Sequence, residues 1–330
     1  MKTVNVLVTS AGVSSALNVI KSLRLQNEFS VSICAVDMDP LAPGLYLAEF
    51  AYVSPPISDV KKYLDFLFGI CDRHHINALY PCYSKELSVI AREKEAFDRI
   101  GVKTLLPAPE TIDLCNDKRK FTEFARGLGL TVPKTFSTDE VQNIPVSEFP
   151  LFVKPVTGSS STGAVKLDDK KALDYYLYQN KDVLIQQFVE GQEITVDVFC
   201  NRSSKPLVIA PRIRLSTKGG QSIKGKTINN KDFIEPVTTL CQALSLQGVC
   251  NIQFIMSKVG IVFIELNPRY AAGGLMLTVH AGANIPVLAL KTMLGYDIKE
   301  NECKTKLNIY MTRYWEEIFT KNDSLPPIRH

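Results

Sequence analysis

The stretch that most constrains this chain is residues 261–269, which read Ile-Val-Phe-Ile-Glu-Leu-Asn-Pro-Arg. Its continuous apolar start predicts a buried β-strand, and Pro268 ends that strand because proline donates no ladder hydrogen bond. Glu265 and Asn267 are two residues apart, so both side chains leave the same face of an extended chain. A carboxylate beside an amide suits a hard cation such as Mg²⁺, and Arg269 can clamp an anion. The alternative is a strand that simply ends in an Asn-Pro turn, with its charged side chains solvated.

Composition narrows the class of protein. A chain of 330 residues with 45% hydrophobic and 22% charged residues is typical of a globular protein with two or three cores. The net charge of +4 comes from interspersed charges, so neither nucleic acid nor a membrane is expected as a partner. No apolar run reaches the roughly 18 residues of a membrane-spanning helix, and we expect no signal peptide. The eight cysteines form no Cys-x-x-Cys pair, which favours reduced, buried thiols in a cytoplasmic protein over zinc or disulfides.

Residues 1–107 predict a Rossmann-like α/β domain with a parallel sheet, because strands alternate with helices. Strands are expected over residues 4–9, 31–36 and 78–81, and helices over 16–25, 60–74 and 84–100. The turn at 10–15 has a single glycine and lacks the Gly-x-Gly-x-x-Gly fingerprint, so a dinucleotide oxidoreductase is disfavoured. Asp37 follows the second strand and either holds a ribose hydroxyl or is merely solvated.

A lysine and a Gly/Ser-rich loop stand together in the middle of the chain. Lys154 lies at the end of an expected strand over 149–155, and the polar loop 156–165 follows it. Glycine and serine allow backbone N–H groups to turn inward around phosphate oxygens, and the lysine adds a point charge. Without that charge, the loop would read as an ordinary hairpin connection.

The rest of the chain alternates further helices and strands. Helices are expected over residues 121–128, 170–180, 233–247, 275–282 and 285–294, and strands from 183 and over 194–200, 206–213, 249–256, 261–266 and 303–314. The Gly/Lys-rich segment 216–227 between them is predicted to be a mobile loop. Several apolar helices offer a face for a homodimer.

Three separated motifs occur in order: the lysine-ended strand with its Gly/Ser loop, a strand leading to Glu190-Gly-x-Glu193, and a hairpin carrying Gln253 and Glu265-x-Asn267-Pro-Arg269. Together they resemble the ATP-grasp superfamily, specifically the carbamoyl-phosphate-synthase-like branch of carboxylate–amine ligases, over about residues 1–315. The resemblance implies an α/β protein that is α+β in its ATP-grasp part. A pre-ATP-grasp Rossmann-like domain would occupy 1–107, a small lid subdomain 108–188, a C-terminal subdomain with a metal site 189–315, and a tail 316–330.

The resemblance also implies a role for each matching residue. The implied ATP-binding set is Lys118, Lys154, Gly158, Ser159, Ser160, Ser161, Gln187, Phe188, Val189 and Glu193. In that set the lysines contact phosphates, Gln187 and Val189 the adenine edge, and Glu193 the ribose. The implied ligands for Mg²⁺, or alternatively Mn²⁺, are Gln253, Glu265 and Asn267. The implied catalytic residues are Arg269, which steadies the transferred phosphoryl group, and Arg212 and Arg214, which contact substrate or phosphate.

We therefore expect an ATP-dependent ligase that phosphorylates a carboxylate to an acyl phosphate and joins it to an amine. Such chemistry needs positioning and charge neutralisation and no protein nucleophile. Its expected partners are a small-molecule carboxylate and an amine. One alternative is an ATP-binding sensor or regulatory protein without turnover, because residues 157–163 carry Ser-Ser-Ser-Thr where many relatives have another glycine. A second is a single-unit bicarbonate kinase of the carbamoyl-phosphate type.

Overall fold

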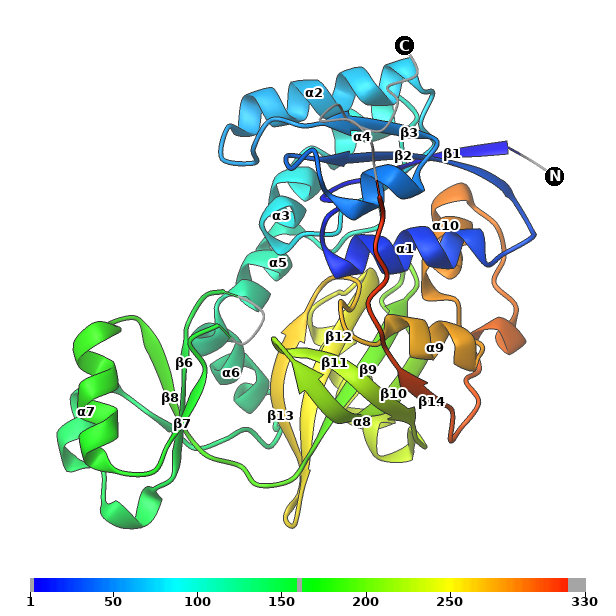
Figure 1. Ribbon diagram of the computed structural model, residues 1–330. Coiled ribbons are helices and arrows are strands. Elements are labelled where there is room, and N and C mark those ends of the chain that lie inside the picture. Colours follow the sequence, from blue (N-terminus) through cyan, green and yellow to red (C-terminus); the bar gives the residue numbers. More distant parts are fainter. Residues whose placement is uncertain (1–2, 159–161, 320–330) are drawn as a thin grey trace.

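Three β-sheets organise residues 3–158 and 162–319, the part of the chain that the computed structural model describes (Figure 1). The N-terminal sheet has the strand order β3-β2-β1-β4, and the small sheet has the order β5-β8-β6-β7. The large sheet has the order β13-β12-β9-β10-β11-β14. Figure 1 shows the small sheet standing apart from the other two, joined to the rest through the region of α6 and the chain leading to β9.

The N-terminal sheet is parallel throughout, which confirms the predicted α/β class. Its elements are β1 (Thr3–Val8), α1 (Ser14–Arg24), β2 (Ser30–Asp37), η1 (Pro43–Leu47), β3 (Phe50–Val53), α2 (Val60–Arg73), β4 (Ala78–Tyr80), α3 (Ser84–Arg92) and α4 (Lys94–Arg99). Val6 packs toward α1 and Leu7 toward α2, so both faces of the sheet are covered and its strands read as continuous apolar runs. The sequence prediction missed β3, and the single helix expected over 84–100 is two helices that meet at Glu93.

The small sheet carries one helix and a short apolar core. Its elements are β5 (Thr135–Phe136), η2 (Thr138–Asn143), η3 (Val146–Glu148), β6 (Leu151–Pro155), β7 (Val165–Leu167), α7 (Lys170–Gln179) and β8 (Val183–Gln187). Val153 and Ile185 are paired on neighbouring strands and pack with Leu173 of α7. The helices α5 (Pro109–Asn116) and α6 (Lys118–Gly127) precede this sheet, and Phe121 of α6 packs on Phe263 of the large sheet.

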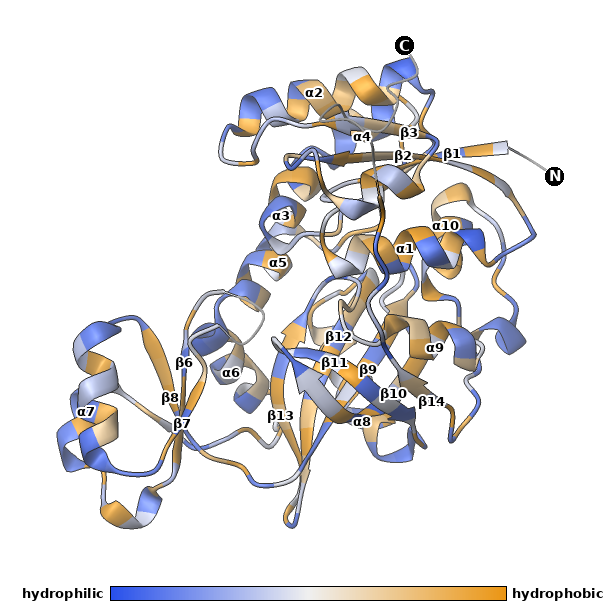
Figure 2. Cartoon of the chain, in the orientation of Figure 1, coloured by the Kyte–Doolittle hydropathy of each residue, from blue (hydrophilic) through white to orange (hydrophobic). Residues whose placement is uncertain are grey.

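The large sheet is antiparallel, and β9 and β12 within it are mostly buried. Its strands are β9 (Gln192–Cys200), β10 (Pro206–Lys218), β11 (Gln221–Thr227), β12 (Gly248–Ser257), β13 (Gly260–Asn267) and β14 (Tyr310–Thr312). Its helices are α8 (Lys231–Ala243), α9 (Leu275–Ala281), α10 (Ile285–Leu294) and the short η4 (Glu300–Cys303). One face packs on α8 and α6, and the other shares a core with α9, α10 and α1. Figure 2 shows α10 as a largely hydrophobic helix, as expected for one enclosed between the large sheet and the N-terminal domain.

Two secondary-structure predictions for the second half of the chain are wrong. The segment 216–227 is not a loop, because β10 and β11 continue through it and turn at Gly219 and Gly220, which have φ of 55° and 70°. A two-stranded ribbon with a solvated face needs few apolar residues, so its polar sequence resembled a loop. The strand expected over 303–314 is reduced to β14 (Tyr310–Thr312). Residues 320–330 of the expected tail lie outside the described part of the chain.

Two further predictions concerned the burial of the cysteines and the lack of a membrane-spanning helix. All eight cysteines are unpaired and seven of them are buried, in line with the burial that the sequence predicted. Among residues 3–158 and 162–319, no helix has the length and apolar character needed to cross a bilayer.

Candidate active site

A cavity of about 990 Å³ brings together side chains from the small sheet, the large sheet and the segment that follows β4 in the N-terminal domain. Its lining includes thirteen residues that the sequence singled out: Lys118, Lys154, Gly158, Gln187, Phe188, Val189, Glu193, Arg212, Arg214, Gln253, Glu265, Asn267 and Arg269. Ser159, Ser160 and Ser161, the other predicted residues, lie outside the described part of the chain. Residues up to 190 positions apart in the chain, from Tyr83 to Gly273, therefore share one concave surface.

Two lysines face the cavity near a single carboxylate. Lys154 ends β6 and is only 5% exposed, and its ammonium has no hydrogen bond or ion pair within the described residues. Burial lowers the pKa of Lys154, and the nearby Glu265 carboxylate opposes that shift. Lys118 begins α6 and donates to the Gly158 carbonyl at 2.8 Å, and burial lowers its pKa as well. A desolvated ammonium without a counterion favours an anionic ligand in the cavity.

The carboxylate and its two amides come from the β12–β13 hairpin. Gln253 pairs with Glu265, and the register shifts directly beyond that pair. Such a bulge beside a cavity changes which side chains face it, and here Ile264, Glu265 and Leu266 all line the wall. Glu265 Oε1 accepts hydrogen bonds from Gln253 Nε2 at 2.8 Å and Asn267 Nδ2 at 3.0 Å.

This donor set fits a hard cation that also takes phosphate oxygens. Mg²⁺ uses few protein carboxylates and shares its ligands with phosphates, so Glu265 with two amide oxygens is a suitable set. No cluster of three or more His, Cys, Asp or Glu side chains with metal-binding geometry occurs in the described part of the chain. The amide nitrogens of Gln253 and Asn267 point at Glu265 here. To ligate a cation, both amides would turn and present their oxygens.

The three arginines have different surroundings. Arg212 is 1% exposed and forms a bidentate pair with Asp197, at 2.9 and 3.2 Å, so its guanidinium is committed to the cavity wall. Arg214 binds Glu193 at 2.9 Å and Gln253 at 3.1 Å. Arg269 has no carboxylate within ion-pair distance among the described residues, and burial lowers its pKa. It therefore resembles Lys154 as a cation without a counterion.

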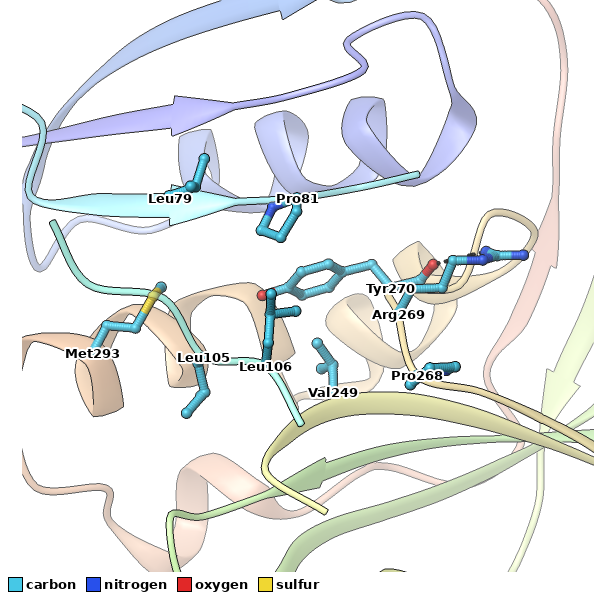
Figure 3. Close-up of a pocket in the computed structure, with 9 residues that line it drawn as sticks. All are labelled: Leu79, Pro81, Leu105, Leu106, Val249, Pro268, Arg269, Tyr270 and Met293. Atoms are coloured by element: carbon cyan, nitrogen blue, oxygen red, sulfur yellow. Dashed lines mark hydrogen bonds between the residues drawn. The ribbon is translucent and has the colours of Figure 1, made fainter. Parts of the chain in front are cut away.

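Contacts with the N-terminal domain fix Arg269 and the residue after it. Arg269 Nε donates to Ser84 Oγ at 2.9 Å, and Nη1 donates to the Tyr270 carbonyl at 3.2 Å. In Figure 3 the Tyr270 ring lies among Pro81, Leu106 and Val249 beside a void of about 10 Å³, while the Arg269 guanidinium extends away from it. The packed tyrosine thus anchors the backbone from which the arginine projects.

The end of β8 and the residues that follow it offer backbone groups and apolar neighbours that could bind a flat polar ring. Gln187 N–H donates to the Lys134 carbonyl at 2.8 Å and Phe188 N–H to the Pro150 carbonyl at 3.1 Å. The Val189 N–H has no such backbone partner among residues 3–158 and 162–319. Apolar side chains line the cavity from both the small and the large sheet, including Phe152, Ile255, Ile264 and Leu266.

Sequence reasoning missed three residues of this site. Asn251 Nδ2 donates to the Arg269 carbonyl at 3.0 Å, and its position two residues before Gln253 on one strand could have revealed it. Ser84 follows a parallel strand at its carboxyl end, where such sheets bind ligands, so a weak signal existed. Asp197 gave no signal, because its importance depends on pairing with Arg212 across the sheet.

Three sequence families match successive parts of the chain. Residues 6–105 match the PylC-like N-terminal domain, and residues 131–219 match the D-ala D-ala ligase C-terminus. Residues 179–315 match the family described as ATP-grasp in the biosynthetic pathway with Ter operon.

The chain is also similar in sequence to curated large chains of carbamoyl phosphate synthase. The carbamoyl phosphate synthase large chain of Clostridium beijerinckii is 28% identical over 221 residues, which are 61% of this chain and 20% of that protein. The large chain of Clostridium acetobutylicum is 24% identical over 293 residues, 77% of this chain and 27% of that one. The chain therefore spans about a quarter of the length of these relatives.

Solved structures share the fold at low identity. The biotin carboxylase of Campylobacter jejuni superposes with a TM-score of 0.71 at 16% identity, covering 92% of this chain and 74% of that one. The L-amino acid ligase of Bacillus licheniformis gives a TM-score of 0.66 at 16% identity, covering 92% and 78%. In sequence the chain is thus similar to ATP-grasp proteins, among them the large chain of carbamoyl phosphate synthase, and in fold it is similar to biotin carboxylase and L-amino acid ligase.

Proposed function

We propose that this protein is an ADP-forming carboxylate–amine ligase. The carboxylate oxygen would attack the γ-phosphorus of ATP while the bond to ADP breaks. The amine nitrogen would then attack the acyl carbon while the bond to phosphate breaks. The observation that carries the proposal is the pair of desolvated lysines, Lys154 and Lys118, beside the Glu265 carboxylate in one cavity. Charge neutralisation of this kind is what phosphoryl transfer requires of a protein.

The remaining lining residues have complementary roles in this proposal. Lys154 and Lys118 would hold phosphate oxygens together with the loop that contains Gly158. The Val189 N–H, which has no backbone partner among the described residues, would donate a hydrogen bond to the adenine edge. Glu193, whose Oε1 makes no ion pair in the same part of the chain, would accept hydrogen bonds from the ribose hydroxyls. Unpaired groups of this type are the ones that gain most from a polar ligand.

The hairpin would hold the cation that ATP brings. Glu265, Gln253 and Asn267 offer one carboxylate and two amide oxygens for Mg²⁺, and Mn²⁺ accepts the same ligands. When bound, the cation would neutralise charge on the transferring phosphoryl group. Arg269, oriented by Ser84, would stabilise the same phosphoryl group and the acyl phosphate. Arg212 would support the wall through Asp197.

Hydroxylamine trapping tests the proposal. ADP release is measured with MgATP against a panel of carboxylates, bicarbonate included, and amines, while hydroxylamine converts acyl phosphates to hydroxamates. We expect carboxylate-dependent ADP and hydroxamate, and a fall of about a hundredfold or more in Glu265→Gln. The matched control Glu235→Gln changes an exposed carboxylate on α8 and should retain full rates.

Two outcomes would redirect the assignment. Bicarbonate-dependent ADP release without organic hydroxamate would point to a bicarbonate kinase. Tight nucleotide binding with no ADP release from any panel member would favour an ATP-binding protein without turnover.

A further inference from the structure

Arg214 connects three parts of the cavity wall. It lies on β10, and its side chain is 8% exposed. Nη1 lies 2.9 Å from Glu193 Oε2 on β9 and donates to Gln253 Oε1 on β12 at 3.1 Å. Nη2 donates to the Gly220 carbonyl in the β10–β11 turn at 2.7 Å. A single guanidinium nitrogen therefore touches both the residue assigned to the ribose and one assigned to the cation.

The shared nitrogen makes the two neighbours interdependent. Gln253 uses its oxygen for Arg214 and its nitrogen for Glu265, so the amide is held in one orientation. If the amide turned its oxygen to a cation, its NH₂ group would face Arg214, and two donors would oppose each other. Nη1 would then keep only its contact with Glu193, while Nη2 would still donate to the Gly220 carbonyl. Cation binding would thereby tighten the placement of the Glu193 carboxylate.

We propose that Arg214 is a positioning residue that couples the cation end of the nucleotide site to its ribose end, an inference that rests on the proposed ATP site. Arg214 acts on the nucleotide through Glu193 and Gln253. Coupling of this kind is reciprocal. The bound cation increases the contribution of the ribose hydroxyls to nucleotide affinity, and the bound hydroxyls increase the affinity for the cation by the same factor. Among residues 3–158 and 162–319, neither Lys154 nor Arg269 makes a contact that would link the two ends of the site.

The test measures binding alone, so it needs no substrate. Calorimetry gives the dissociation constants of ADP and of 2′,3′-dideoxy-ADP, each with Mg²⁺ and with a chelator. The ratio of the two constants is the ribose discrimination. In the wild type we expect this ratio to be about fivefold larger with Mg²⁺ than without it. In Arg214→Met the ratio should be equal in the two conditions within about twofold.

Two further variants make the result specific. Arg214→Lys keeps the positive charge but cannot reach Glu193, Gln253 and Gly220 together, so it should lose the Mg²⁺ dependence while still folding. Arg202→Met removes an exposed arginine from the β9–β10 turn, at the opposite end of the same sheet, and should behave as the wild type. Thermal melts check that each variant folds. If Arg214→Met does not fold, the comparison of wild type with Arg214→Lys decides the result.

The outcomes separate the two proposals. A wild-type protein that binds no ADP would overturn the proposed nucleotide site and this inference together. ADP binding with a ribose discrimination that does not respond to Mg²⁺ would overturn only the coupling. So would an Arg214→Met protein whose discrimination responds to Mg²⁺ as in the wild type, because Arg214 would then be only a structural arginine.

Discussion

Lys154 is placed for binding at a cost to stability. An ammonium that is 5% exposed has lost most of its hydration, and no described residue replaces it with a hydrogen bond or ion pair. Burial accordingly lowers the pKa of this lysine from its ordinary value of 10.5. Proteins tolerate such groups where a ligand supplies the missing charge, so residues that bind well often weaken the empty protein.

Replacing Lys154 by methionine should therefore stabilise the fold and abolish turnover. We expect Lys154→Met to raise Tm by about 2–4 °C, measured by calorimetry. MgADP should then add less to Tm than it does in the wild type. The exposed Lys231→Met is the control and should shift neither value. A lower Tm for Lys154→Met would contradict the idea that the ammonium is uncompensated.

The buried Lys154 also makes the stability of the folded protein depend on pH. Because its folded-state pKa lies below its unfolded value of 10.5, the unfolded chain binds more protons between those two values. Wild-type stability should rise with pH in that window, and the rise should be absent in Lys154→Met. Urea midpoints measured on both proteins across the alkaline range give the difference directly.

At the scale of elements, the hairpins and helices with clear periodicity could be predicted from sequence, but the ribbon of β10 and β11 could not. Its strands carry charges on the solvated side and turn through Gly219 and Gly220, so nothing local separates it from a loop. The break at Glu93 was equally invisible, because helix-forming residues continue on both sides. Long-range packing decided both cases.

One close packing between elements depends on the absence of a side chain. Gly274 precedes α9 with φ of 121°, and a Cβ there would lie 2.5 Å from Arg212 Nη1. Arg212 cannot move aside freely, because Asp197 holds it at 2.9 Å while Thr278 of α9 also donates to Asp197 at 2.6 Å. The segment between β13 and α9 is therefore fitted to the buried ion pair.

Gly274→Ala should destabilise the protein by about 2–4 kcal/mol, because it combines an unfavourable φ with a clash against a buried pair. Urea unfolding measures the loss. Gly69→Ala in α2 is the matched control, since a Cβ there meets open space and a helical glycine gains from alanine. Equal midpoints for the two variants would show that Arg212 adjusts at no cost.

At the scale of the whole molecule, the N-terminal domain reaches into the cavity through its β4–α3 turn. Glu86 is fully buried and accepts hydrogen bonds from the Cys82 and Tyr83 N–H groups, both at 2.8 Å, and from Tyr63 at 2.5 Å. Burial raises the pKa of Glu86, and these donors oppose the shift. They fix the turn that presents Ser84 to Arg269.

This link between domains explains which part of the site escaped prediction. Glu265, Asn267 and Arg269 could be predicted because they occur at alternate positions along β13 and just beyond its end. Ser84 and Arg269 stand 185 positions apart, and only the packing of the two domains on a shared core brings them together. The sequence patterns that predict strands carry no information about such a contact.

Ser84 should therefore affect chemistry although it belongs to the other domain. Ser84→Ala leaves Arg269 Nε without its partner, so the guanidinium samples other orientations. We expect kcat to fall about tenfold to a hundredfold, with KM for ATP unchanged within about twofold. Ser84→Thr retains the hydroxyl and should restore most of the rate, and the exposed Ser58→Ala should match the wild type. A proportional change of kcat and KM, or no rescue by threonine, would mean that Ser84 acts only through packing, and the N-terminal domain would then have no part in orienting Arg269.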